Sequence, residues 1–486
     1  MQKRIWPFIL LGFFLLFLSI GAGMYFFIQN KTPEQIFNYP IIKNTILNRV
    51  GSERKELVDL LPQFLGFHEP KTYLILFENN TEIRPGGGFI GTYATVKVTQ
   101  GKVDVLAVEG TEVLDKRTPA TWKPQPPKMI QEKLGLDRWY FRDSNWSPDY
   151  PTDVQKALEF YAAEGGVNAK EIDGVIAFTP AVLEKLLEIT GPLTIEGVTF
   201  NSENVVVTLE HEVEYGFEKK GIDFIDRKKI IQPFFHELLK KIGPDAVIHT
   251  QKYVDLFEGL AREKQVLVYF KDETIQNIMK KRGWTGEVKS TDQDYLLWVD
   301  ANLGALKTDA KIKRELSYSV DSKGVNGSVN WVGSARMKYI HTGVFDKFTS
   351  RYRTYARVYV PEGSELIEVT SIDKNGKAKK ITTVDQGREL GKQWFGVYFV
   401  VEPQEIGELN FLYMLPDRIR LQGEQGKYHL LTQKQSGLEN IALTLKLNFD
   451  TTIQTAKPAE DKKNWGDTFY SYSSDFREDK EFSIGF

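Results

Sequence analysis

The feature of this sequence that most constrains its fold is an uninterrupted uncharged run near the start of the chain, from Ile5 to Ile28. The run is rich in Leu, Ile and Phe, and a helix of roughly 20 apolar residues is long enough to cross the hydrocarbon core of a bilayer. Lys3 and Arg4 precede the run, and positive charges favour the cytoplasmic side of a membrane. We therefore predict a cytoplasmic stub and transmembrane anchor over residues 1–31, with the rest of the chain outside the cytoplasm.

A cleaved signal peptide is the alternative interpretation of this segment, because Ser19 and residues 21–23 are small. The apolar centre of a signal peptide spans only about 7–15 residues. Here the apolar run resumes from Met24 to Ile28. The sequence therefore favours an uncleaved signal anchor and a single-pass protein of the cell membrane.

The composition of the whole chain is that of an ordinary globular protein, and it excludes several classes of function. Apolar residues make up 41% of the 486 residues and charged residues 26%, so the length predicts two or three domains. A net charge of −2 gives no electrostatic footprint for nucleic acid. The absence of cysteine excludes disulfides, thiol catalysis and iron–sulfur clusters, and six histidines alone make a structural zinc site improbable.

Hydrophobic periodicity divides the rest of the chain into three parts. Amphipathic turns between Thr32 and Phe67 predict a helical stalk over residues 32–68. Strand patterns then alternate with helical patterns, which predicts an α/β domain over residues 69–306 with a three-layer-like arrangement of a mixed sheet and helices. After Lys307 only short strand patterns separated by turns remain, so we predict an all-β sandwich over residues 307–486.

The densest glycine cluster, TEIRPGGGFIG at residues 81–91, has the spacing of a dinucleotide-binding turn. A nucleotide fingerprint requires a helix directly after the glycines, whereas residues 92–98 alternate as a strand. We expect a turn between strands whose backbone amides form an anion-binding nest beside Arg84. The alternative is a connecting loop without a ligand. The residues of the expected nest are Gly86, Gly87 and Gly88.

Two polar clusters supply the remaining candidate site residues. The segment YFRDSNWSPDYP sets Arg142 and Asp143 among aromatic residues and prolines, and Asp226 and Arg227 stand at the first turn of an amphipathic helix. Arginine suits a phosphate because its guanidinium group donates two parallel hydrogen bonds, and a nearby carboxylate can hold Mg²⁺ or orient the arginine. The alternative for both clusters is a structural ion pair that fixes a loop.

Several stretches together resemble the bacterial domain-of-unknown-function family DUF 4012. They are LILFENNTEIRPGGGFIGTY, RDSNWSPDYP, IDGVIAFTPAVLEKLLEITGP, DANLGALKTD and YARVYVPEGSEL. The resemblance covers most of the chain from about Tyr73 onward. It implies a bacterial envelope protein with one N-terminal anchor, and it implies no reaction.

The order of the expected elements also resembles, more distantly, that of the LytR-CpsA-Psr proteins. These are anchored envelope proteins that move glycopolymers from a polyprenyl-pyrophosphate carrier onto the cell wall. The positions that match are Arg84 after the first strand and the pair Asp226 and Arg227 at a helix start. The chain departs from that family where EGTEVLD stands in place of an arginine–aspartate signature, so the sequence leaves open whether the protein is an enzyme.

These features lead to the hypothesis of an envelope protein that binds, and transfers, a polyprenyl-pyrophosphate-linked glycan. Mg²⁺ would shield the leaving pyrophosphate. In this hypothesis the phosphate ligands are Arg84, Arg142 and Arg227, and the catalytic carboxylates that hold metal or orient arginines are Asp143 and Asp226.

The rival hypothesis is a non-catalytic scaffold or adhesion protein of the envelope that binds through its β-sandwich. A periplasmic small-molecule receptor ranks third, because the chain lacks a pair of similar halves. The expected partners are the membrane and either a polyprenyl-linked glycan or a cell-wall polymer, and not nucleic acid. The hypotheses separate on one point: the transfer hypothesis requires the three arginines to share a cleft.

Overall fold

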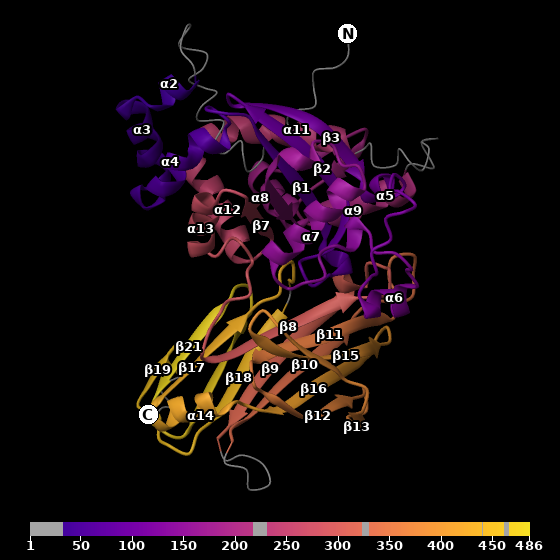
Figure 1. Ribbon diagram of the computed structural model, residues 1–486, viewed down its shortest axis with the longest axis vertical. Helices are drawn as coiled ribbons and strands as arrows, with labels where there is room; N and C mark the ends of the chain where they lie inside the picture. The colour runs from indigo at the N-terminus through magenta and orange to yellow at the C-terminus, as the bar shows by residue number, and fades with distance from the viewer. Residues whose placement is uncertain (1–32, 217–230, 323–329, 440, 461–465) are drawn as a thin grey trace.

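The computed structural model describes residues 33–216, 231–322, 330–439, 441–460 and 466–486 (Figure 1). The predicted transmembrane anchor and the pair Asp226 and Arg227 lie outside these ranges. Within them, no helix combines the length and apolar character needed to cross a bilayer. A mixed α/β part fills the upper half of Figure 1 and a β-rich part the lower half, which confirms the predicted fold class at this level.

A mixed sheet of five strands forms the centre of the α/β part. Its strands are β1 (Lys71–Asn79), β2 (Phe89–Thr99), β3 (Lys102–Gly110), β4 (Ile172–Phe178) and β7 (Val266–Phe270), in the order β3-β2-β1-β4-β7. Only β1 and β4 pair in parallel, and the other neighbours are antiparallel. Successive side chains of a strand point to opposite faces, so Tyr73 and Ile75 of β1 join one hydrophobic core while Leu74 and Leu76 join another.

Helices cover both faces of this sheet and complete three layers. The face of Leu74 packs against α7 (Tyr150–Ala163). The opposite face packs against α4 (Lys55–Phe64), α8 (Ala181–Thr190), α11 (Ile231–Ile248), α12 (Thr250–Arg262) and α13 (Glu273–Lys281). The shorter elements of this part are α2 (Pro33–Phe37), α3 (Pro40–Val50), α5 (Thr111–Asp115), α6 (Lys128–Leu134), α9 (Val205–His211), β5 (Leu193–Ile195) and β6 (Val198–Phe200).

The segment that the sequence assigns to a separate stalk packs on the α/β part. Val58 and Leu61 of α4 lie in the same hydrophobic core as strand residues of the sheet. Arg54, directly before α4, donates to both carboxylate oxygens of Glu258 on α12 at 2.9 and 2.7 Å. The periodicity therefore predicts the helices correctly. Their apolar face is buried against the sheet and α12, so the segment is part of the α/β part and not a separate stalk.

Two sheets, each of seven strands among the residues described, form the β-rich part. The first has the order β13-β12-β16-β10-β9-β18-β20, the second the order β14-β15-β11-β8-β17-β21-β19, and their inner faces share one hydrophobic core. The elements are β8 (Asp294–Asn302), β9 (Ile312–Asp321), β10 (Val332–His341), β11 (Tyr352–Pro361), β12 (Glu365–Ile372), β13 (Ala378–Ile381), β14 (Asp385–Glu389), β15 (Lys392–Val401), β16 (Ile406–Met414), α14 (Asp417–Glu424), β17 (Lys427–Gln433), β18 (Ile441–Asn448), β19 (Thr455–Lys457), β20 (Phe469–Asp475) and β21 (Lys480–Gly485).

Strand β8 lies in the sandwich, although the sequence pattern places it in the α/β part. It pairs with β11 and, in parallel, with β17. All of its residues are buried, so its apolar run carries no alternation that would show which sheet it joins.

The glycine-rich turn after β1 is wedged between the two parts. The side chain of Ile83 lies in the sandwich core. Its backbone N–H donates to Asp309 Oδ2 at 3.1 Å, and its carbonyl accepts from the N–H of Asn302 at 3.0 Å. On the other side, a Cβ added to Gly437 would lie 2.1 Å from the carbonyl oxygen of Gly87, so the turn and the loop after β17 meet backbone to backbone. The turn is therefore a structural junction.

Candidate functional site

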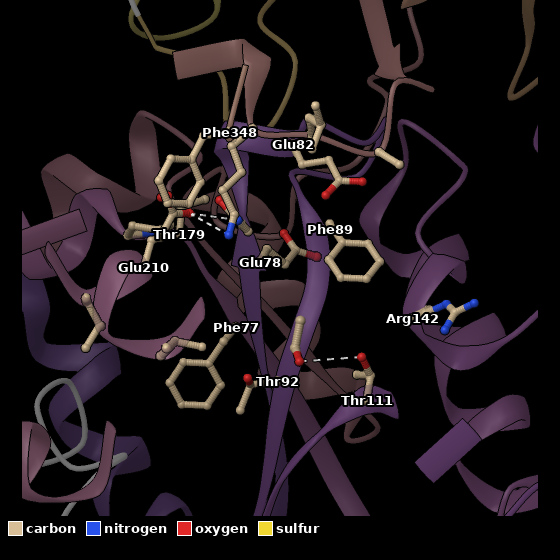
Figure 2. A pocket seen from close by; sticks show the side chains of 18 of the residues that line it. Phe77, Glu78, Glu82, Phe89, Thr92, Thr111, Arg142, Thr179, Glu210 and Phe348 are labelled. Atoms are coloured by element: carbon tan, nitrogen blue, oxygen red, sulfur yellow. Dashed lines mark hydrogen bonds and ion pairs between the residues drawn. The ribbon is translucent and has the colours of Figure 1, made fainter. Parts of the chain in front are cut away.

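A cavity of about 510 Å³ opens where β1 and β4 end (Figure 2). Because these strands run parallel, Phe77 and Phe178 lie in register at the same edge of the sheet. Ligands of α/β proteins bind beyond the carboxyl ends of parallel strands, and this volume lies in the usual range for small-molecule sites. Residues 305–307 and 347–348, which follow strands of the sandwich, close the cavity from the other side.

Aromatic and aliphatic side chains form much of the cavity wall. Phe77 packs edge-on against Phe178 with ring centroids 4.6 Å apart, and Phe89 and Phe348 face the same space from the turn and from the sandwich (Figure 2). Aliphatic side chains of α8 and α9 extend this surface. Such a wall suits the apolar body of a ligand.

Basic side chains reach the cavity from three different segments. Lys307 Nζ lies 3.6 Å from Glu210 Oε1, and that oxygen also accepts from the side-chain amide of Asn79 at 3.0 Å. Arg142 stands on the far side of Phe89 from Glu210 (Figure 2). Lys347 is exposed beside Phe348. The cavity therefore offers cationic groups around an apolar wall.

Glu78 is a buried carboxyl group in this wall. It accepts a hydrogen bond from the side-chain amide of Asn145 at 3.2 Å. Burial raises the pKa of Glu78 to about 8, and the hydrogen bond from Asn145 opposes that rise only in part. At pH 7 this carboxyl group is therefore mostly neutral and adds no full negative charge to the cavity.

Replacing Glu78 with glutamine is expected to remove part of the loss of stability that the protein suffers at alkaline pH. The folded-state pKa of about 8 lies above the ordinary value of 4.5, so between these values the folded state binds more protons than the unfolded state. The free energy of unfolding then falls as pH rises through this window, by at most about 1.4 kcal/mol per pH unit.

Denaturant titrations at pH 5 and pH 8.5 measure this effect. The wild type should lose more unfolding free energy between the two pH values than Glu78→Gln, because the other buried carboxyl groups are common to both proteins. Glu56→Gln, at an exposed position of α4, is the matched control and should follow the wild type. Equal losses in wild type and Glu78→Gln would show that Glu78 is ionised throughout.

Arg84 lies inside the junction and not in the cavity wall. Its side chain is 2% exposed, with Nη2 2.9 Å from Glu82 Oε1 and Nε 3.2 Å from Asp143 Oδ1. Its Nη1 donates to the carbonyl of Asn302 at 2.9 Å. These groups of the protein occupy the fork of the guanidinium, so the expected contact between Arg84 and a phosphate does not fit this position.

The backbone N–H groups of the expected anion nest already donate to acceptors within the protein. The N–H groups of Gly86 and Gly87 donate to the carbonyls of Asn145 and Arg84 at 3.2 and 3.0 Å. Gly86, Gly87 and Gly88 are all buried, and a Cβ on Gly86 would lie 2.0 Å from Asp153 Oδ2. These three glycines therefore allow close packing, and of the glycines in residues 81–91 only Gly91 lines the cavity.

The structure brings Arg84 and Arg142 to one carboxylate. Asp143 is 2% exposed and lies 3.2 Å from Arg84 Nε and 3.6 Å from Arg142 Nε. Arg142 Nη1 also donates to Asp115 Oδ2 at 2.7 Å, and burial raises the pKa of Asp115 to about 7. Arg142 lines the cavity whereas Asp143 is absent from its wall, so Asp143 is placed to orient arginines.

Two further expectations concern Mg²⁺ and the second polar cluster. No group of three or more carboxylates and histidines among the described residues has the arrangement of a metal site, and the predicted role of Asp143 in holding Mg²⁺ stays a prediction. Asp226 and Arg227 lie outside the described ranges, and their predicted roles stay predictions.

Sequence reasoning missed the side of the cavity that the sandwich provides. Lys307, Lys347 and Phe348 stand in loops far along the chain from β1; Lys307 lies in the stretch DANLGALKTD that resembles the family, but no motif marks Lys347 or Phe348. Glu210 lies on α9 and faces Lys307 across the cavity.

Residues 68–214 match the model of a family described as "Protein of unknown function (DUF4012)". The matched segment runs from just before β1 to the end of the cavity wall on the α/β side, and the resemblance to this family is confirmed there. No curated protein matches the chain.

Three solved structures to which the chain is similar have low identity and low TM-scores. A nutrient binding protein from Legionella pneumophila has 7% identity and a TM-score of 0.24, with 40% of this chain and 71% of that chain covered. Yeast LTA4 hydrolase has 10% identity and a TM-score of 0.21, and the match covers 36% of this chain and only 29% of the hydrolase. An M1 zinc metallopeptidase from Deinococcus radiodurans has 14% identity and a TM-score of 0.17, with coverages of 36% and 42%. TM-scores this low support no inference about fold or function.

Proposed function

With residues 68–214 forming a DUF4012 domain, we propose that this chain is a membrane-anchored, extracytoplasmic protein of the bacterial cell envelope that binds a polyprenyl-linked glycan carrier. The observation that carries the proposal is the cavity at the ends of β1 and β4, whose apolar wall bears three basic side chains. A polyprenyl phosphate is complementary to this cavity, because its apolar chain matches the apolar wall and its anionic head matches the basic side chains.

The basic groups that contact the phosphate in this proposal are Arg142, Lys307 and Lys347. Four acidic residues line the same cavity, namely Glu78, Glu82, Glu112 and Glu210. Burial raises the pKa of Glu78 to about 8, Glu82 is paired with Arg84 and Glu210 with Lys307, so three of the four oppose an anion less than a free carboxylate would. Cationic hydrogen-bond donors to phosphate are among the strongest in proteins, so three such groups supply the head with its contacts.

The apolar chain has a path out of the cavity. Val344 and Phe345 are 56% and 61% exposed, and they stand in the same loop as Lys347 and Phe348 at the cavity wall. Exposed apolar side chains gathered at one place mark contacts with lipids or partners. A polyprenyl chain longer than the cavity would therefore continue along this loop.

Binding without transfer is the activity that the site geometry favours. The resemblance to the LytR-CpsA-Psr proteins expected from the sequence would imply transfer, but Arg84, the one matching position in the described ranges, is taken up by internal contacts. Asp143 stands behind Arg142 and away from the cavity wall. The same internal contacts favour the second candidate, a non-catalytic scaffold or adhesion protein that uses the sandwich for binding.

A binding experiment with the full-length chain in detergent separates the two candidates, with undecaprenyl phosphate as the probe and undecaprenol as its uncharged counterpart. We expect the phosphate to bind at least about tenfold more tightly than the alcohol, and Lys347→Gln and Phe348→Ala to weaken it by about tenfold. Lys380→Gln, on β13 at the far end of the sandwich, is the matched control and should bind as the wild type does. Equal affinity for phosphate and alcohol, or no binding of either, would contradict the proposal and leave the scaffold.

A further inference from the structure

A second cavity, of about 630 Å³, lies between the segment 127–156 of the α/β part and strands β11, β14 and β15 of the sandwich. It shares no lining residue with the cavity at the strand ends. Nothing in the proposed function uses it, so its chemistry stands on its own.

Aromatic side chains from both parts of the protein line this second cavity. Trp146 and Tyr355 lie nearly parallel, with an interplanar angle of 5° and ring centroids 6.3 Å apart. Trp139 and Trp394 also line the space. The guanidinium carbon of Arg357 lies 5.4 Å from the ring centroid of Trp146 and 6.0 Å from that of Trp394. These cation–π contacts hold the two aromatic side chains in place. The wall thus offers several flat apolar faces.

Two polar atoms in residues that line this cavity have no hydrogen-bond partner in the part of the chain that the structure describes. They are Ser144 Oγ and Arg357 Nε, in residues that are only 1% and 4% exposed. A buried polar atom without a partner costs free energy, and a ligand that supplies the hydrogen bond recovers it. Arg357 Nε donates and the hydroxyl of Ser144 can donate or accept, so a ligand with hydroxyl groups can satisfy both atoms.

The charges around this cavity are balanced. Lys128 Nζ lies 3.5 Å from Asp385, and Arg357 Nη1 donates to Glu389 at 3.4 Å. Of the remaining ionisable residues of the wall, Lys156 is paired with Glu159 at 2.7 Å, and burial raises the pKa of Asp153 well above its usual value, which favours its neutral form. A cavity with this balance gives no net attraction to an anion or a cation, in contrast to the first cavity.

We propose that this second cavity binds a neutral saccharide. The aromatic faces would pack against the C–H faces of sugar rings. This contact is favourable because it removes apolar surface of both partners from water. The hydroxyl groups of the sugar would accept from Arg357 Nε and pair with Ser144 Oγ. Because both parts of the protein form the wall, the saccharide would bridge the α/β part and the sandwich.

Isothermal titration and tryptophan fluorescence with cellotetraose, chitotetraose, maltotetraose and mannotetraose test this inference on the full chain. At least one of these should bind with a Kd below about 1 mM and quench tryptophan emission. Ser144→Ala should weaken that binding by about tenfold without lowering thermal stability, because the hydroxyl has no partner to lose in the free protein. Trp394→Ala should abolish binding, and Trp122→Ala, which lies outside the cavity, should not.

The inference is overturned if none of the four tetrasaccharides binds, or if both Ser144→Ala and Trp394→Ala bind as the wild type does. Undecaprenyl phosphate binding is measured on the same proteins. Since the two cavities share no residue, Ser144→Ala should leave it unchanged, and the two proposals can fail separately.

Discussion

Replacing Arg84 with methionine is expected to lower the free energy of unfolding by about 3–5 kcal/mol. The methionine fills similar space, but Glu82 and Asp143 would stay in the interior without this guanidinium between them. The carbonyl of Asn302 would lose its donor as well. Because Asn302 belongs to β8 and Asp143 to the α/β part, the loss should fall on the junction between the two parts.

Denaturant titration followed by circular dichroism measures this loss. Arg336→Met is the matched control, because Arg336 forms an exposed pair with Glu408 on the surface of the sandwich, and such pairs contribute only about 0–1 kcal/mol. The account of Arg84 as a structural residue would be contradicted by an Arg84→Met protein that is as stable as Arg336→Met and has lost affinity for undecaprenyl phosphate.

Replacing Arg314 with methionine is the second change with a large expected effect, again about 3–5 kcal/mol. Arg314 is 2% exposed and bonds to Asp300 at 2.8 Å, to the hydroxyl of Tyr352 at 2.7 Å and to Asp309. Removing the guanidinium leaves two buried carboxylates close together. Asp309 also accepts the N–H of Ile83, so the disturbance should reach the junction turn.

A double-mutant cycle tests whether uncompensated charge is the cause. Asp309→Asn removes one of the two carboxylates, so Arg314→Met combined with Asp309→Asn should cost less than the sum of the two single changes. Strictly additive losses would mean that Arg314 stabilises the sandwich by packing and not by charge.

The fold class follows from the sequence wherever the pattern is local. The alternation in residues 92–110 predicts the hairpin of β2 and β3, and Gln100 and Gly101 take the positive φ values of 51° and 75° that a two-residue hairpin turn requires. Burial on both faces removes this kind of signal. The fully buried β8 was therefore recognisable as an element, but the sheet that it joins was not. In α3 and α4 the pattern predicts a helix with an apolar face, but it does not identify the surface against which that face packs.

The candidate site was harder to predict because it depends on contacts between distant segments. An arginine beside a glycine-rich turn has the same sequence pattern whether it binds a phosphate or buried carboxylates. For Arg84 the deciding partners are Asp143 and Asn302, which are 59 and 218 residues away. Likewise, Lys307 and Phe348 complete the cavity from loops of the sandwich, and periodicity cannot place loops.

The central claim, that the cavity at the ends of β1 and β4 holds the lipid carrier, is tested most directly by mass spectrometry of lipids that co-purify with the detergent-solubilised full-length protein. We predict a polyprenyl phosphate species in stoichiometric amount with the wild type and its loss from a Lys347→Gln, Phe348→Ala double variant. A wild-type protein that carries no more polyprenyl phosphate than the double variant would contradict the claim.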